Sequence, residues 1–272
     1  MASRAGVRRS VVSIISLLSV LWCFTSSALA IVTLSNGNSS LDVNATTQAG
    51  MYNWSIDGQD ILAQQWFWFR VGNGPGQSSL DTLPSAVTLT TPSTVTASFT
   101  GTSFIVTLNL SLVGGAAGSG TSDLSIQANI KNTSAGPLTF HFYEYSDFDF
   151  GVSDTVVFLN SNTVVQTGSN GSVQEAVATG LSGSLAPTHH ETGTFPNTLT
   201  SLNSTNNYTL NDSNSAGPGD LTWAFQWDAI NLAAGTTTQL SKDLNVVIPE
   251  PSTISLGLLG LVGLFALRRN RH

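Results

Sequence analysis

Acidic side chains are the first residues of this sequence whose type and spacing suggest chemistry. Asp147, Asp149 and Asp154 lie in one short segment that Gly151 interrupts. Calcium takes about six to eight oxygen ligands, often carboxylates at alternate positions beside a turn that glycine allows. We therefore name these three acids as candidate calcium ligands. The spacing is not that of an EF-hand, and the alternative is a solvated strand edge with its loop, because phenylalanines alternate with the acids.

Histidines are a second candidate, for proton transfer or for metal binding. His189, His190 and Glu191 are consecutive, and His141 stands apart from them. Neighbouring side chains on a strand point to opposite faces, so His189 and His190 would not share one zinc ion. Pro187 precedes them and favours a loop. An acid acting with His141 or His190 is the catalytic alternative that these residues leave open.

Aromatic side chains are a third candidate, for binding sugar rings. Residues 65–70 read QWFWFR. On a strand, Trp66 and Trp68 share one face, so we name them as candidate ligand-binding residues whose flat rings would stack on a pyranose. The alternative is a strand buried on both faces. A second aromatic alternation, at residues 223–227, favours a place in the core.

No motif of a known catalytic nucleophile occurs in the sequence. It has no Gly-x-Ser-x-Gly, no catalytic cysteine, no phosphate-binding loop and no zinc-protease helix. A pair of carboxylates can cut a glycosidic bond, but no spacing rule selects a pair among these acids. We therefore predict that the chain is not an enzyme, with no catalytic residue and no cofactor besides the candidate calcium.

Strands are the elements that must position these residues, because apolar residues alternate with polar ones almost throughout. The clearest alternations run over residues 104–112 and 124–131. Further strands are predicted near 40–45, 52–56, 65–71, 86–91, 94–100, 138–147, 155–159, 163–167, 172–178, 198–202, 221–228 and 240–248. Asp57-Gly58 predicts a type I′ hairpin. The predicted fold class is all-β, a large antiparallel two-sheet β-sandwich over residues 31–247.

Charge is sparse and unevenly distributed. Of nine basic residues, six lie outside residues 31–247, whereas of sixteen acidic residues only Glu250 does. The body thus has three basic and fifteen acidic residues, a net charge of −12. Because proteins bind nucleic acid by neutralising phosphates with Lys and Arg, this excludes a nucleic-acid partner. Cys23 is the only cysteine, so no disulfide stabilises the body.

The N-terminus has the pattern of an export signal. Arginines precede an apolar run at residues 11–24, and Ala28 and Ala30 occupy the two positions that signal peptidase reads. Residues 1–30 are therefore predicted to be a signal peptide cut after Ala30. The alternative is a retained anchor helix.

The C-terminus has three parts in order: Pro249, Glu250 and Pro251; an apolar run at 254–267; and a basic tail of Arg268, Arg269 and Arg271. A basic tail after an apolar helix stays in the cytoplasm, which leaves the body outside. The run is shorter than the roughly 20 residues of a stable span, which favours transient anchoring in the inner membrane.

Together with Ile248, these parts resemble the PEP-CTERM sorting domain. Residues 248–272 are therefore identified as a sorting signal with a hydrophobic transmembrane helix and a basic tail. The resemblance implies an exosortase partner in a Gram-negative bacterium, processing near the Pro-Glu-Pro motif, and a final place at the cell surface or in the extracellular matrix. It also implies an association with exopolysaccharide or biofilm.

Two functions follow from these observations. The first is a non-enzymatic structural or glycan-associated role in exopolysaccharide or biofilm. The alternative is a secreted carbohydrate-active enzyme or carbohydrate-binding module on the β-sandwich. An exposed Trp66 or Trp68, or converging acids near Asp147, would favour the alternative.

Overall fold

The computed structural model describes residues 31–249, apart from residues 75, 152 and 180. The predicted signal peptide at 1–30, and the apolar helix and basic tail predicted after residue 249, lie outside the described residues. Within the described part, no helix has the length and hydrophobicity needed to cross a membrane.

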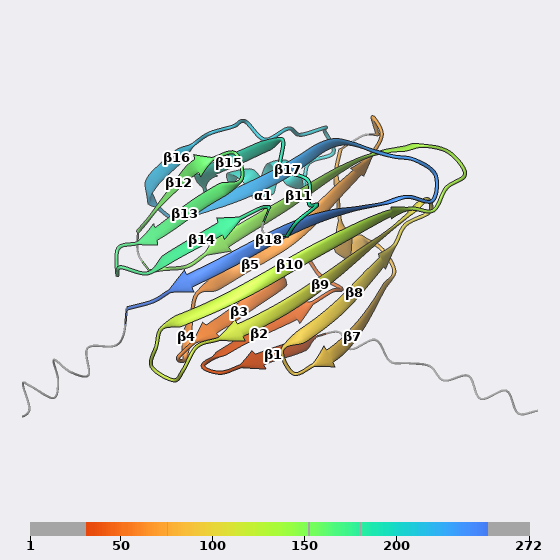
Figure 1. Cartoon of the computed structure of the whole chain (residues 1–272). Helices are drawn as coiled ribbons and strands as arrows, with labels where there is room; N and C mark the ends of the chain where they lie inside the picture. The colour runs from red at the N-terminus through yellow and green to blue at the C-terminus, as the bar shows by residue number, and fades with distance from the viewer. Residues whose placement is uncertain (1–30, 75, 152, 180, 250–272) are drawn as a thin grey trace, which may run out of the picture.

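Two large sheets pack face to face and make up the body (Figure 1). The first sheet has the order β1 (Val32–Asn36), β2 (Ser39–Asn44), β3 (Gly50–Ile56), β5 (Leu62–Val71), β11 (Leu138–Phe148), β17 (Leu221–Leu232) and β15 (His189–Thr194). The short strands β4 (Gln59–Asp60) and β6 (Ser78–Ser79) pair with β3 and β5.

The second sheet runs β16 (Ser215–Gly219), β12 (Asp154–Asn160), β13 (Thr163–Gly168), β14 (Val173–Val177), β18 (Thr237–Val247), β10 (Thr121–Asn132), β9 (Phe104–Gly114), β8 (Thr94–Thr100) and β7 (Ser85–Thr91). Among the described pairs, only β3 and β5 are parallel. The predicted all-β two-sheet sandwich is confirmed.

Burial follows the period of two that the sequence shows. Along β9 and β10 buried and partly exposed residues alternate, so one face of each strand packs on the first sheet. The core between the sheets is rich in aromatic rings. Phe104 of β9, for example, lies 4.9 Å from Phe140 of β11 between ring centroids, in an edge-to-face contact.

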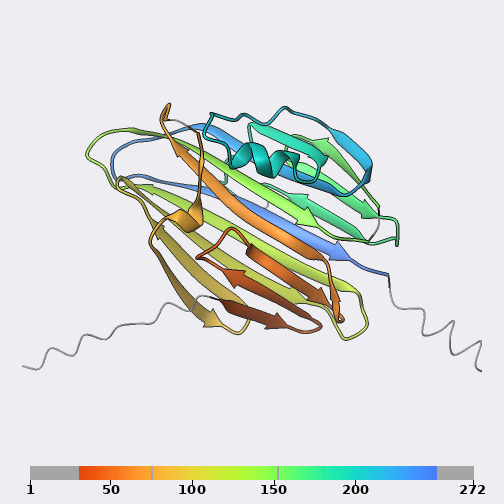
Figure 2. The same ribbon diagram turned by 180° about the vertical axis from the view of Figure 1, so that it is seen from behind.

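Strands β5 and β11 are buried on both faces. One face meets the second sheet, and the other is covered by the helix α1 (Asn197–Leu202) and the chain that follows it (Figure 2). Trp68 Nε1 donates to Asn203 Oδ1 at 3.0 Å, and Tyr143 Oη donates to the Tyr208 carbonyl at 2.9 Å. These bonds fix the covering segment to the first sheet.

The predicted Asp57-Gly58 turn is confirmed, since both residues have positive φ, 49° and 82°. The Asp57 carboxylate also accepts the backbone N–H groups of Gly118 and Gly120, at 2.7 and 2.9 Å. These two bonds tie the β3–β4 hairpin to the loop between β9 and β10.

Two local predictions are wrong. Residues 198–202, predicted as a strand, form α1, in which Thr198 and Leu202 are buried four positions apart, a helical spacing. The histidine segment, predicted as a loop after Pro187, forms β15, because it pairs along its length with the edge of β17. In both short segments, contacts with neighbouring elements decide the secondary structure more than the local sequence does.

Candidate functional site

Three neighbouring strands of the first sheet bring Arg70, His141 and Asp228 together. Arg70 of β5 lies directly opposite His141 of β11. On the other side of β11, the pairing with β17 shifts by a bulge, and Ala229 has a positive φ of 47°. Bulges turn side chains away from the regular alternation, and this one brings Asp228 to the histidine.

The three side chains contact one another directly. His141 Nδ1 is in hydrogen-bond contact with Asp228 Oδ1 and lies 3.1 Å from Arg70 Nη2. Arg70 Nη2 is 3.7 Å from Asp228 Oδ1, and its Nη1 donates to the Gly72 carbonyl at 3.0 Å. Arg70 and His141 are buried, whereas the Asp228 side chain is 30% exposed. The carboxylate is therefore the part of the cluster that solvent reaches.

The surroundings of the cluster favour the charged form of Asp228 and the neutral form of the neighbouring Tyr143 phenol. Partial burial opposes ionisation, but the His141 ring and the Arg70 guanidinium hold the pKa of the Asp228 carboxyl below its usual range. Burial raises the pKa of the Tyr143 phenol, which Arg70 offsets in part. A carboxylate, an imidazole, a guanidinium and a phenol thus meet at one place.

Two nitrogen atoms of this cluster have no hydrogen-bond partner within the described part of the chain. They are His141 Nε2 and Arg70 Nε, and both are buried. Buried polar atoms are nearly always paired, so an unpaired set beside an ionised acid is typical of a site that binds a polar ligand.

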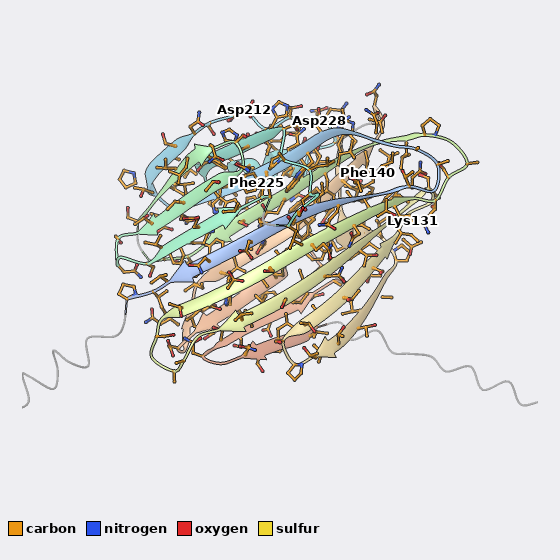
Figure 3. All side chains as sticks on the ribbon, in the orientation of Figure 1. Lys131, Phe140, Asp212, Phe225 and Asp228 are labelled. Carbon is orange, nitrogen blue, oxygen red and sulfur yellow. The ribbon has the colours of Figure 1, made fainter. Side chains whose placement is uncertain are left out.

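A pocket of about 450 Å³ opens beside Asp228. Its lining includes Thr188, Trp227, Asp228, Ala229 and Asn231. Ligand pockets commonly have about 300–1,000 Å³, so this one has room for a small polar molecule. In Figure 3, Asp228 and Asp212 lie along the upper part of the molecule, above Phe140 and Phe225.

A second hollow, of about 500 Å³, lies over strands β8, β9, β10 and β18 of the other sheet. Its lining combines apolar side chains such as Ile126 with the polar side chains of Thr96, Asn109 and Gln127, and it includes no histidine. It has no acid–base pair like that of His141 and Asp228. We therefore take the pocket beside Asp228 as the candidate site.

Trp66 and Trp68 are not an exposed sugar-binding surface, which corrects the interpretation of QWFWFR as a stacking platform. Their relative exposures are 1% and 0%. Trp66 Nε1 donates to Asp81 Oδ1 at 3.1 Å, and its ring meets Phe99. Because β5 lies inside the sheet and is covered on both faces, its aromatic side chains belong to the core.

The candidate calcium ligands lie near one another but do not converge as a ligand set. In the described ranges, no three His, Cys, Asp or Glu side chains are grouped as a metal ion requires. Asp149 Oδ1 accepts the Gly151 N–H at 3.0 Å, and Asp154 Oδ2 accepts from Gln166 at 2.9 Å. Calcium binding at Asp147, Asp149 and Asp154 stays a prediction.

The buried Asp147 should make the stability of the fold depend on pH. Burial, with the charges of Asp220 and Asp149, raises the pKa of Asp147 to about 7. The folded chain thus holds this proton more tightly than the unfolded chain, so ionisation weakens the fold as pH rises from about 4 to 7. Asp147→Asn should be more stable than wild type at pH 8, on the order of 2 kcal/mol, and equal to it at pH 4. Urea unfolding at both pH values measures this, and an equal difference at both would contradict it.

His189 and His190 share one partner, Asp212. His189 Nδ1 lies 2.9 Å from Asp212 Oδ2, and the His190 N–H donates to Asp212 Oδ1 at 3.2 Å. Glu191 is buried and accepts three hydrogen bonds, from Thr198 Oγ1, Tyr208 Oη and the Asn211 N–H, at 2.7, 2.6 and 3.0 Å. This carboxylate holds the covering segment on the sheet.

Glu191→Ala is therefore expected to lower the free energy of unfolding by about 3 kcal/mol, because two hydroxyl groups and one backbone N–H of the covering segment lose a charged acceptor. Hydrogen exchange should quicken at residues 197–211 before it quickens in β9 and β10. Glu175→Ala, at an exposed position of β14, is the control and should leave both unchanged. Uniform loss of protection over the whole body would argue against this role.

Known proteins resemble this chain in a C-terminal motif and in the fold of the body. A family model described as the PEP-CTERM protein-sorting motif matches residues 247–271. The chain carries a PEP-CTERM sorting motif. It is therefore an exported protein that exosortase processes and that is sorted to the cell surface through the membrane. No curated protein matches the chain.

Solved structures resemble the body. A bacterial glucoamylase in complex with acarbose has a TM-score of 0.57 at 11% identity, over 86% of this chain and 35% of that one. A galactose mutarotase related enzyme from Lactobacillus acidophilus has 0.53 at 9%, over 81% and 99%. A protein from Synechocystis sp. PCC 6803 has 0.54 at 10%, over 80% and 96%. The chain thus spans about a third of the glucoamylase but nearly all of the mutarotase-related enzyme.

These similarities establish the fold and correct one prediction. The prediction that the chain is not an enzyme rested on absent motifs, and structural neighbours that are enzymes of sugars overturn it. Sequence reasoning named His141 but missed Arg70 and Asp228. Neither residue has a local signal, since only the strand order and the bulge bring them to the histidine.

Proposed function

We propose that the body is a carbohydrate-active enzyme domain whose site is the cluster of Arg70, His141 and Asp228. The observation that carries the proposal is the contact between a buried histidine and an ionised carboxylate at the wall of a pocket. The fold, shared with a glucoamylase and a mutarotase-related enzyme, supports a sugar as the substrate.

The chemistry of the cluster favours interconversion of aldose anomers over cleavage of a glycosidic bond. Glycoside hydrolysis uses two carboxylates, about 5–9.5 Å apart. In this cluster Asp228 is the single acid, and Glu144 of the same sheet points into the core. Ring opening of a free sugar needs one group that takes the proton of the anomeric hydroxyl and one that protonates the ring oxygen, and closure reverses both transfers; a carboxylate and a histidine supply these two groups.

Arg70 has an electrostatic role in this scheme. Opening the ring moves negative charge onto a sugar oxygen, and a fixed guanidinium stabilises such charge most in a site that excludes water. Arg70 is held by the Gly72 carbonyl and lies beside both other groups, so it needs no rearrangement during the reaction.

The sorting motif gives the setting. We propose that the chain is held briefly in the inner membrane of a Gram-negative bacterium, is cut by exosortase, and then acts on free sugars or sugar ends at the cell surface or in the exopolysaccharide matrix.

The test uses the purified exported protein and freshly dissolved α-galactose or α-glucose. NMR follows the approach of each anomer to equilibrium. The protein should accelerate this approach over buffer in proportion to its concentration. Equal rates with and without protein, for a panel of hexoses and pentoses, would reject the proposal.

A further inference from the structure

A second polar cluster lies inside the sandwich, between the two sheets. Lys242 of β18 reaches inward from the second sheet, and Glu144 of β11 faces it from the first; their side chains are 3% and 0% exposed. Gln65 of β5 is also fully buried and lies beside Glu144. Neither the sugar site nor the sandwich requires charged groups here. The other buried residues on this face of β18 are apolar, so the pattern would place an apolar residue where Lys242 lies.

One oxygen atom, Glu144 Oε1, accepts hydrogen bonds from three side chains. Glu144 Oε1 accepts hydrogen bonds from Lys242 Nζ and, at 3.2 Å, from Gln65 Nε2. Ser146 Oγ donates to the same oxygen at 2.5 Å. The amine of Lys242 and the carboxamide of Gln65 are thus both held on one carboxylate oxygen. Gln65 Oε1 and Glu144 Oε2 are buried and have no partner in the described residues.

Aromatic rings surround this group. Lys242 Nζ lies 4.8 Å from the centre of the Trp223 ring, and Phe67, Phe142 and Trp227 line a small hollow with Glu144 and Lys242. Burial lowers the pKa of Lys242 to about 8, although the Glu144 carboxylate opposes the shift. A buried amine with such neighbours is readily available in its neutral, nucleophilic form.

We propose that Lys242 and Gln65 form an intramolecular isopeptide bond, with Glu144 moving the proton. Glu144 takes a proton from the Lys242 ammonium, and the Nζ lone pair attacks the Gln65 Cδ carbon. The carbon–nitrogen bond of the carboxamide then breaks, a second proton passes from Nζ to the departing nitrogen, and that nitrogen leaves as ammonia. An ammonium, a carboxylate and a carboxamide become a secondary amide, a neutral carboxylic acid and ammonia, so atoms and charge balance without any further reagent.

Two features of the chain favour this bond. Glu144 Oε1 holds the amine and the carboxamide of one chain close together, and such proximity raises the effective concentration of an intramolecular nucleophile by many orders of magnitude. The product also removes a buried ion pair, whose desolvation is costly. The exported body has no cysteine, so a covalent link between β5 and β18 would join the two sheets where no disulfide does.

The test is mass spectrometry of the denatured wild-type protein. The mass should be about 17 Da below that of the processed sequence, the loss of one ammonia. Digestion should yield one branched peptide that joins the chain around Gln65 to the chain around Lys242, and trypsin should fail to cut after Lys242.

Three variants complete the experiment. Lys242→Met and Glu144→Gln should each have the full sequence mass and no branched peptide, whereas Lys131→Met, at an exposed lysine, should keep the loss. The full mass in wild type overturns the proposal, and this result needs no variant to fold. A loss of about 18 Da with a peptide joining residues 144 and 242 overturns it too, since water would then have left from Glu144.

Discussion

His141→Asn should lower kcat for anomer interconversion by about 10²–10⁴-fold, the usual effect of removing a positioned acid or base. Asparagine has nearly the bulk of the imidazole and can still hydrogen-bond Asp228 and Arg70, but it does not exchange protons near neutral pH. KM should change far less than kcat, because the sugar-binding contacts of the pocket wall remain. Stopped-flow polarimetry of freshly dissolved α-anomer measures both constants.

His189→Asn is the matched control for this variant. His189 also pairs with a carboxylate, Asp212, but it lies on the edge strand β15, and Asp212 does not line the pocket, whereas Asp228, the partner of His141, does. Its activity should equal that of wild type, and both variants should unfold at the wild-type temperature within a few degrees. An equal loss of activity in the two variants would remove the catalytic role from His141.

Trp223→Ala is expected to lower the free energy of unfolding by about 4 kcal/mol, because it removes a large side chain from the centre of the core. Trp223 has no solvent exposure, stacks on Phe148 with ring centroids 6.2 Å apart, and meets Phe225 edge to face. Lys242 of the second sheet also lies over the Trp223 ring, and neighbours held on two sheets do not collapse into the space that the indole leaves. Urea denaturation, followed by tryptophan fluorescence of the remaining indoles, measures the loss.

Trp223→Phe separates volume from hydrogen bonding. The indole Nε1 of Trp223 has no hydrogen-bond partner in the described part of the chain, so phenylalanine removes no bond and leaves a smaller cavity. The loss in free energy of unfolding for Trp223→Phe should be less than half the loss for Trp223→Ala. Equal costs for the two variants would mean that something other than cavity volume governs this position.

The sandwich was predictable from the sequence because its information is local. The alternation over residues 104–112 and 124–131 specifies which face of β9 and β10 is buried, and Asp57-Gly58 specifies a turn without any distant contact. β15 and α1 were not predictable in this way. The first becomes a strand only because β17 offers an edge. The second packs against β15 and β17, and the chain that follows it is bonded to Trp68 and Tyr143.

The candidate site depends on contacts that no local pattern contains. Arg70 and His141 meet because β5 and β11 are neighbours, although 71 positions separate them in the chain. Asp228 joins them through a bulge in β17. The aromatic residues misled for the same reason: an alternation of Trp and Phe is identical for a strand covered on one face and for one covered on both.

The most direct measurement of the proposed site is a titration of the histidine side-chain NMR signals with the preferred aldose. The signals of the His141 ring should move with a binding curve that matches KM, while those of His189 stay in place. Turnover accompanied by shifts at His189 or His190 alone, with His141 unmoved, would contradict it.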